Sequence, residues 1–165
     1  MHASPAVFIV VGLLPSLPLA DSEADVRSAI EAAISKSLSA TRNKDIEAFI
    51  ASLPDDGVIQ DEAGHRMTKQ ELRANILRDW KIIVNTIAIE ENIESLKVDS
   101  PLEATVYTSQ RWERIMLEKD GVTKDNVVTT QRHRESWRKT AKGWQVYKVQ
   151  ELGGKVWVNG KPYQP

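Results

Sequence analysis

The stretch RHRESWRKTAKGWQVYKVQEL, residues 132–152, predicts two β-strands joined by a tight turn. The turn is Ala141-Lys142-Gly143, and a tryptophan stands on either side of it. Strands joined by so short a link must be antiparallel neighbours in one sheet. This hairpin therefore predicts an antiparallel meander in the C-terminal half of the chain.

Longer strands are expected before this hairpin. Period-two patterning predicts strands at 104–117 and 127–140, joined by a loop at 118–126, and one or two strand segments at 87–98. The two long segments, of about 14 residues each, exceed the usual 5–6 residues of a strand. Their length indicates strands that bend around a core.

Helical patterning comes before the strands. Apolar residues at helical spacing predict a helix at 22–41 and, after a break at 43–45, a second short helix. Thr68 and Glu71 form a capping box, which predicts the start of a third helix. Helices followed by a strand meander indicate the α+β class, with the helices on one face of the sheet.

The N-terminus predicts a targeting segment. Residues 6–20 read AVFIVVGLLPSLPLA, and an apolar run of about 14 residues is too short to span a bilayer. We expect residues 1–20 to be a signal peptide cleaved near Ala20, or an N-terminal anchor, and the protein to be periplasmic or secreted. A buried N-terminal strand or helix is the alternative.

The rest of the chain is expected to form one domain. Residues 21–152 hold the helices and the meander, and the last strand of the meander is predicted at 144–152. Residues 153–165 are then a C-terminal tail, with an edge strand at 155–158. A chain of 165 residues suits a single domain of roughly 100–200 residues.

Composition excludes several classes of protein. The formal net charge is −1, whereas nucleic-acid binders usually carry a basic face, so no nucleic-acid partner is predicted. The absence of cysteine excludes disulfides, thiolate metal sites and a cysteine nucleophile. The three histidines are His2, His65 and His133, too few for a multi-histidine zinc site. We predict no metal, no cofactor and no membrane span beyond the N-terminal segment.

Two segments carry a resemblance to a known superfamily. Residues 43–72, NKDIEAFIASLPDDGVIQDEAGHRMTKQEL, and residues 132–152 resemble the nuclear transport factor 2-like superfamily, in particular its ketosteroid-isomerase-like and SnoaL-like branch. The resemblance implies a cone-shaped, curled antiparallel sheet backed by three N-terminal helices. It specifies the fold better than the activity, because this fold hosts isomerases, dehydratases, cyclases, hydrolases and assembly domains.

The resemblance also implies a catalytic acid. Asp61 follows the short strand Val58-Ile59-Gln60 at the position of the general base in the isomerase-like enzymes. A carboxylate in an apolar cavity has a raised pKa and can take a proton from carbon. Those enzymes also place a tyrosine on the first helix, and residues 35–38 contain none. The alternative role for Asp61 is to cap the turn before Gly64.

Alternation sorts the strand residues into two faces. Trp137 should seek the core, and Gln131, His133 and Glu135 share its face, so we expect them to point into the cone. His133 can move protons near neutral pH and is the second candidate catalytic residue. A structural histidine on the concave sheet, or one in a dimer interface, is the alternative. The predicted ligand-binding residues are Trp80, Tyr107, Trp112, Gln131, Glu135 and Trp137.

Three functions follow from these residues. The first is an exported module that binds a small apolar molecule, or that pairs with a second copy through its sheet, without catalysis. The second is an isomerase, dehydratase or hydrolase that uses Asp61 and His133. The third is an assembly domain that oligomerises through the sheet. A structure with Asp61 and His133 facing one enclosed pocket would favour the second.

Overall fold

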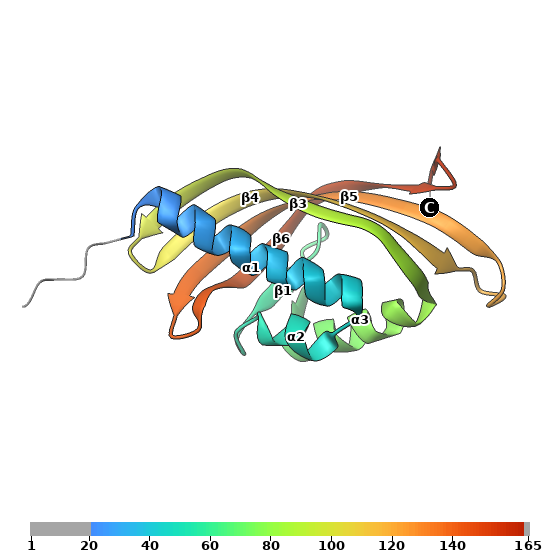
Figure 1. Cartoon of the computed structure of the whole chain (residues 1–165), viewed down its shortest axis with the longest axis horizontal. Coiled ribbons are helices and arrows are strands. Elements are labelled where there is room, and N and C mark those ends of the chain that lie inside the picture. The colour runs from blue at the N-terminus through green and yellow to red at the C-terminus, as the bar shows by residue number, and fades with distance from the viewer. Residues whose placement is uncertain (1–20, 164–165) are drawn as a thin grey trace, which may run out of the picture.

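A long curled sheet arches over three helices in the computed structural model, which describes residues 21–163 (Figure 1). The sequence prediction for residues 1–20 lies outside the described residues. In chain order the elements are α1 (Glu23–Asn43), α2 (Ile46–Ala51), β1 (Val58–Gln60), β2 (Arg66–Thr68), α3 (Lys69–Ile82), β3 (Ile83–Ser100), β4 (Glu103–Leu117), β5 (Lys124–Thr140), β6 (Gly143–Val158) and β7 (Lys161–Pro162). None of the described helices is long and apolar enough to cross a membrane.

The sheet is unclosed and has the strand order β2-β1-β6-β5-β4-β3, with β7 paired to β6. The long strands β3 to β6 are antiparallel neighbours, as the short links between them predict. The exception to the predicted antiparallel sheet is β1, which pairs with β6 in parallel. A long stretch of chain separates β1 from β6, so no tight turn fixes their relative direction. The α+β cone with helices on one face is therefore confirmed, with one parallel pair in it.

The C-terminal boundary differs from the prediction. Strand β6 does not end at Leu152 but continues to Val158, and residues 155–158 pair with 127–130 of β5. A register shift at Arg132/His133 lets the strand continue past Gly153, whose φ of 128° suits glycine. Residues 155–158 therefore form a strand as predicted, but as the end of β6 and not as a separate edge strand, and β7 pairs with this end.

The capped third helix forms as its sequence predicts. Glu71 N donates to Thr68 Oγ1 at 3.3 Å, and Thr68 N donates to Glu71 Oε2 at 2.8 Å. An equivalent capping box, between Ser22 and Asp25, begins α1. Each box satisfies backbone donors that would otherwise lack a partner. These caps fix where α1 and α3 begin over the sheet.

The core lies between α1 and the concave face of the sheet. Val26 and Ile30 of α1 are at most 1% exposed, and they pack with Val106 and Ala104 of β4. Burying such a side chain contributes roughly 1.5–3 kcal/mol. Trp137 closes the cluster from β5. The core holds one part of the sheet against α1 and leaves the rest of the concave face to a cavity.

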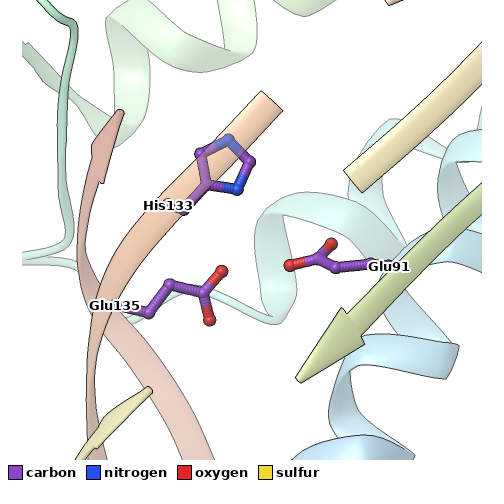
Figure 2. Close-up of side chains that lie close together, drawn as sticks. All are labelled: Glu91, His133 and Glu135. Atoms are coloured by element: carbon purple, nitrogen blue, oxygen red, sulfur yellow. The ribbon is translucent and has the colours of Figure 1, made fainter. Parts of the chain in front are cut away.

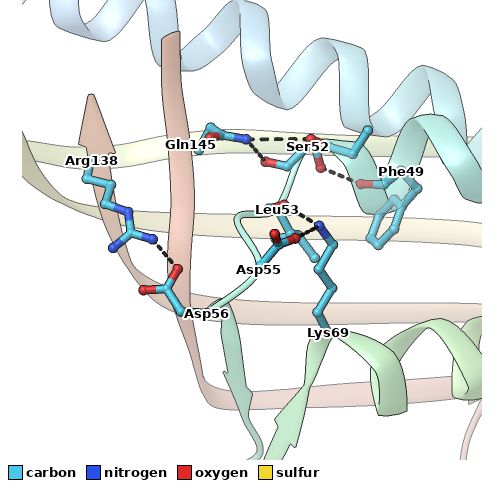
Figure 3. A network of polar contacts seen from close by, with 9 residues as sticks. Phe49, Ser52, Leu53, Asp55, Asp56, Lys69, Arg138 and Gln145 are labelled. Carbon is cyan, nitrogen blue, oxygen red and sulfur yellow. Dashed lines mark hydrogen bonds and ion pairs between the residues drawn. The ribbon is translucent and has the colours of Figure 1, made fainter. Parts of the chain in front are cut away.

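A polar network holds the segment after α2 against the sheet and α3 (Figure 3). Gln145 of β6 donates through Nε2 to the carbonyl of Ser52 at 3.3 Å. Lys69 Nζ donates to the carbonyl of Leu53 at 2.8 Å and to Asp55 at 2.9 Å. These contacts close one wall of the cavity, because Ser52 and Leu53 line it.

Candidate functional site

A cavity of about 300 Å³ lies between the three helices and the concave face of the sheet. Its walls are mainly apolar, and they include Leu38 of α1, Phe49 of α2, Ile76 and Trp80 of α3, and Trp112 of β4. The rings of Phe49 and Trp80 meet edge to face, with centroids 6.3 Å apart. A volume and lining of this kind suit a small apolar molecule.

Three proton-carrying side chains converge on the sheet wall of this cavity. Glu91 comes from β3, and His133 and Glu135 come from β5 (Figure 2). One ligand atom of each lies within 4.8 Å of one atom of each of the others. His133 and Glu135 share a face because they are two residues apart on a strand. Glu91 reaches them from β3, which lies on the other side of β4 in the sheet. Figure 2 shows its carboxyl group opposite that of Glu135.

Hydrogen bonds orient the two carboxyl groups. Thr108 Oγ1 donates to Glu135 Oε1 at 3.1 Å, and Trp137 Nε1 donates to Glu135 Oε2 at 2.7 Å. Gln110 Nε2 donates to Glu91 Oε2 at 3.2 Å. Thr108 is fully buried, and Glu135 is only 4% exposed. The cluster is therefore fixed by buried neighbours before any ligand arrives.

Burial moves the pKa values of this cluster in opposite directions. Desolvation, together with the neighbouring Glu91 carboxyl, raises the pKa of Glu135 from 4.5 to about 8. Desolvation also lowers the pKa of His133, against the opposing effect of Glu91. At neutral pH Glu135 is therefore a protonated acid and His133 a neutral imidazole. An acid and a base coexist in one apolar cavity.

The hydrogen bonds also indicate where the protons sit. The single proton of the Thr108 hydroxyl goes to Glu135, so Thr108 Oγ1 accepts from His133 Nδ1, which lies 3.4 Å away. His133 then carries its proton on Nδ1 and keeps an unprotonated Nε2. One ring nitrogen faces the carboxyl groups in Figure 2, and the other points away from them.

Two carboxylates and an imidazole also match the donor types that bind divalent metal ions. A bound cation would displace the proton of Glu135, so metal binding at this cluster would release a proton and would be favoured by rising pH. The neutral acid and the neutral imidazole are suited to proton transfer without a metal.

The cavity contains most of the residues that the sequence predicted to bind a ligand. It is lined by Trp80, Trp112, Gln131, Glu135 and Trp137, and also by the candidate catalytic residue His133. The prediction that Tyr107 binds the ligand is corrected, because Tyr107 does not line the cavity. Thr108 pairs with His133 on the inward face, so its neighbour Tyr107, which pairs with Arg134, points to the other face.

Asp61 does not reach the cavity. Its Oδ1 accepts from the backbone of His65 at 2.8 Å, and its Oδ2 lies 3.0 Å from His65 Nδ1. The turn between these two residues contains Gly64, with φ of 89°. Asp61 therefore caps this turn, the alternative role, and the structure does not show the convergence of Asp61 and His133 on one pocket that would have favoured an enzyme using both.

Sequence reasoning missed Glu91, Thr108 and Gln110. A usable signal existed for Glu91, because it stands between Ile89 and Ile93 on one face of a strand. A carboxylate flanked by two apolar residues of the inward face points into the core. Ile89 is 4% exposed and Ile93 packs on the core, as that pattern requires.

Comparison with known proteins was made by sequence and by structure. No protein-family model matches the chain, and no curated protein is significantly similar to it. Solved structures do match. A nuclear transport factor 2-like protein from Cytophaga hutchinsonii is 20% identical with a TM-score of 0.61, over 76% of this chain and 95% of that one.

Two further solved structures carry the names of enzymes. A ketosteroid isomerase-like protein from Erwinia carotovora atroseptica is 24% identical with a TM-score of 0.56, over 76% of this chain and 95% of that one. A candidate scytalone dehydratase from Novosphingobium aromaticivorans is 11% identical with a TM-score of 0.66, over 78% and 85%. At these identities the likeness shows the fold, and the chemistry has to be argued from the cavity.

Proposed function

We propose that this chain, whose fold is the nuclear transport factor 2-like cone, is an enzyme that moves a proton on a small apolar ketone. The observation that carries the proposal is the convergence of Glu91, His133 and Glu135 on the wall of a mainly apolar cavity. An apolar cavity excludes water from the bound ketone. Positioned acids and bases of suitable pKa are what proton transfer at carbon requires.

The base in this proposal is His133. Its unprotonated Nε2 takes a proton from the carbon next to the ketone, and the electrons of that bond form the carbon–carbon double bond of an enolate. The acid is Glu135, whose carboxyl proton hydrogen-bonds to the ketone oxygen as negative charge develops there. Thr108 holds both residues, through Glu135 Oε1 and His133 Nδ1.

The outcome depends on the next carbon of the substrate. If that carbon belongs to a double bond, protonated His133 returns the proton further along the chain, and the double bond moves into conjugation. If it carries a hydroxyl group, protonated His133 gives its proton to that group, which leaves as water while the enolate electrons restore the carbonyl group. Both routes give a conjugated enone, with all atoms accounted for.

The neutral Glu135 also supplies the hydrogen-bond donor for the oxyanion, which the sequence of the first helix lacks. Isomerase-like relatives use a tyrosine to hold the developing oxyanion, and residues 35–38 offer none. A carboxyl group that its surroundings keep protonated can donate the same hydrogen bond. The names of two structural neighbours, an isomerase-like protein and a candidate dehydratase, agree with this class of reaction.

The test uses the purified full chain and two sets of cyclic ketones, β,γ-unsaturated and β-hydroxy. Both sets yield conjugated enones, so one rise in ultraviolet absorbance reports isomerisation and dehydration alike. We expect turnover of members of one set, and its loss in Glu135→Gln and in His133→Gln. Turnover that survives both substitutions would overturn the assignment of these residues.

A non-catalytic binding module is the second candidate, supported by the same apolar walls. Ketones that raise the melting temperature of the chain without being converted would favour it. Export of the protein and pairing of two copies through the sheet stay predictions for either function.

A further inference from the structure

Arg114 continues the inward-facing row of β4 beyond the cavity. Gln110 and Trp112 of this row line the cavity, and Arg114 is the next residue on their face. Its guanidinium carbon lies 4.3 Å from the centre of the Trp112 ring. A positive charge therefore stacks on an aromatic wall at the end of the cavity lining.

The neighbours of this guanidinium group are neutral. Arg114 Nη1 donates to Thr129 Oγ1 at 3.0 Å and to the carbonyl of Trp112 at 3.4 Å. Arg114 Nε lies 3.2 Å from Met116 Sδ. The carboxylate that acts on it through space is Asp79, which bonds to Arg78. None of the ion pairs found among residues 21–163 includes Arg114.

Arg111, three residues earlier, provides the contrast on the outer face of the same strand. Its Nη2 binds Glu113 at 2.7 Å, and its side chain is 46% exposed. Arg114 is more buried, and desolvation lowers its pKa, yet an arginine stays charged in a protein. A half-buried cation without a carboxylate partner is suited to receive an anion from outside.

We propose that Arg114 binds the carboxylate of the cavity ligand, so that the substrate is an elongated apolar molecule with a carboxylate at one end. The inference rests on the proposed function, which places the reacting end of the ligand beside Glu91, His133 and Glu135. Glu91 is level with Gln110 in the sheet and His133 with Thr108, so Arg114 lies four to six residues further along β4 than these members of the cluster. Four to six residues of strand span roughly 13–20 Å, about the length of a chain of ten to sixteen carbons.

The apolar walls would bind the body of the ligand, and the guanidinium group of Arg114 would bind its carboxylate. Trp112 presents its ring to the body of the ligand, while the planar guanidinium group can bind both oxygens of a carboxylate. Thr129 and the Trp112 carbonyl already orient that group. An uncharged ligand of equal length would leave the cation without a partner and should bind more weakly.

The experiment compares decanoate with 1-decanol as probes, by calorimetric titration of the full chain at neutral pH. We expect decanoate to bind at least about tenfold more tightly, since a charged hydrogen bond contributes roughly 1.5–3 kcal/mol. Arg114→Met should remove that advantage and leave the affinity for decanol unchanged. Arg111→Met, the matched control on the outer face, should leave both affinities unchanged.

The following outcomes would contradict the inference about Arg114. Equal affinities in the wild type, or an advantage of decanoate that survives both Arg114→Met and Arg114→Gln, would overturn the inference while leaving the proton-transfer proposal standing. If neither probe binds, the inference fails as well. Glu135→Gln should keep the preference for decanoate while losing enone formation, so failure of the binding proposal and failure of the catalytic proposal are distinguishable.

Discussion

Two pairs of a histidine and a carboxylate occur among residues 21–163, and their surroundings differ. Asp61 and His65 bracket a surface turn, and the His65 side chain is 80% exposed. His133 and Glu135 stand side by side on β5 inside the cavity, where Glu135 is 4% exposed. The residue types are nearly the same, so the pairs compare one chemistry in two environments.

The comparison shows that environment sets the role of each carboxyl group. Desolvation tends to raise the pKa of Asp61, but hydrogen bonds from the backbone and ring of His65 outweigh it, and the pKa is lowered. Desolvation prevails at Glu135 and raises the pKa to about 8. Asp61 is therefore an ionised cap on a turn, and Glu135 a neutral acid beside a neutral base.

The largest expected difference between the two pairs is in catalysis. Once a ketone substrate is found, Glu135→Gln should reduce kcat about a hundredfold or more, since a positioned acid or base contributes roughly 10²–10⁴-fold. Asp61→Asn should leave kcat within about twofold, because Asp61 does not line the cavity. Steady-state rates of enone formation measure both. Equal losses in the two variants would remove the distinction on which the proposed site depends.

The pH dependence of stability should also separate the pairs. A carboxyl group with its pKa raised from 4.5 to about 8 binds more protons in the folded state, so stability falls as pH rises between these values. The lowered pKa of His133 makes stability rise with pH below the ordinary histidine value of 6.5. The loss of stability caused by Glu135 should therefore be clearest above pH 6.5. From about pH 6.5 to 8.5 the wild type should lose about 2 kcal/mol, and Glu135→Gln much less.

Urea unfolding at several pH values in that range measures the effect. Asp61→Asn is the control, because the pKa of Asp61 is lowered and its contribution changes only in acid. A wild type as insensitive to pH as Glu135→Gln would show that Glu135 is ionised in the folded chain at neutral pH.

Sequence patterning could predict one strand of this site but not the whole cluster. Alternation places Gln131, His133, Glu135 and Trp137 on one face without any knowledge of the neighbouring strands. Glu91 joins them only through the register of β3 against β4, which shifts at Thr86/Ala88 and at Ile93/Ser95. Such irregularities depend on packing along both strands. No local pattern in the sequence specifies them.

Local patterns do not specify tertiary packing, and this also explains why Asp61 was taken for a catalytic candidate. Its place after a short strand matches the isomerase-like pattern, and that pattern is local. Whether its carboxylate enters the cone depends on the turn that follows, where His65 offers a backbone and a ring donor. A turn residue that can bond its own loop competes with a role in the cavity.

A smaller effect should come from the hydroxyl group that supports the buried pair. Thr108→Val keeps the shape of the side chain but removes the donor to Glu135 Oε1. A buried polar group left without its partner costs about 1–3 kcal/mol, so we expect a loss of about 1–2 kcal/mol in chemical denaturation. The variant should also raise the pKa of Glu135 further, because the ionised form loses a hydrogen bond. Unchanged stability and an unchanged pH profile would mean that Thr108 does not hold this carboxyl group.

The smallest effect is expected at the surface pair. His65→Ala removes the ring contact to Asp61 but keeps the backbone hydrogen bond, and exposed ion pairs contribute roughly 0.2–1 kcal/mol. A double-mutant cycle of His65→Ala and Asp61→Asn should therefore give a coupling energy below about 1 kcal/mol that added salt reduces. A cycle of Thr108→Val and Glu135→Gln should give a larger coupling energy that salt does not change, because its partners are buried. Similar coupling energies with the same salt dependence would show that burial does not separate the two pairs, and the assignment of Glu135 as a buried neutral acid would fail with it.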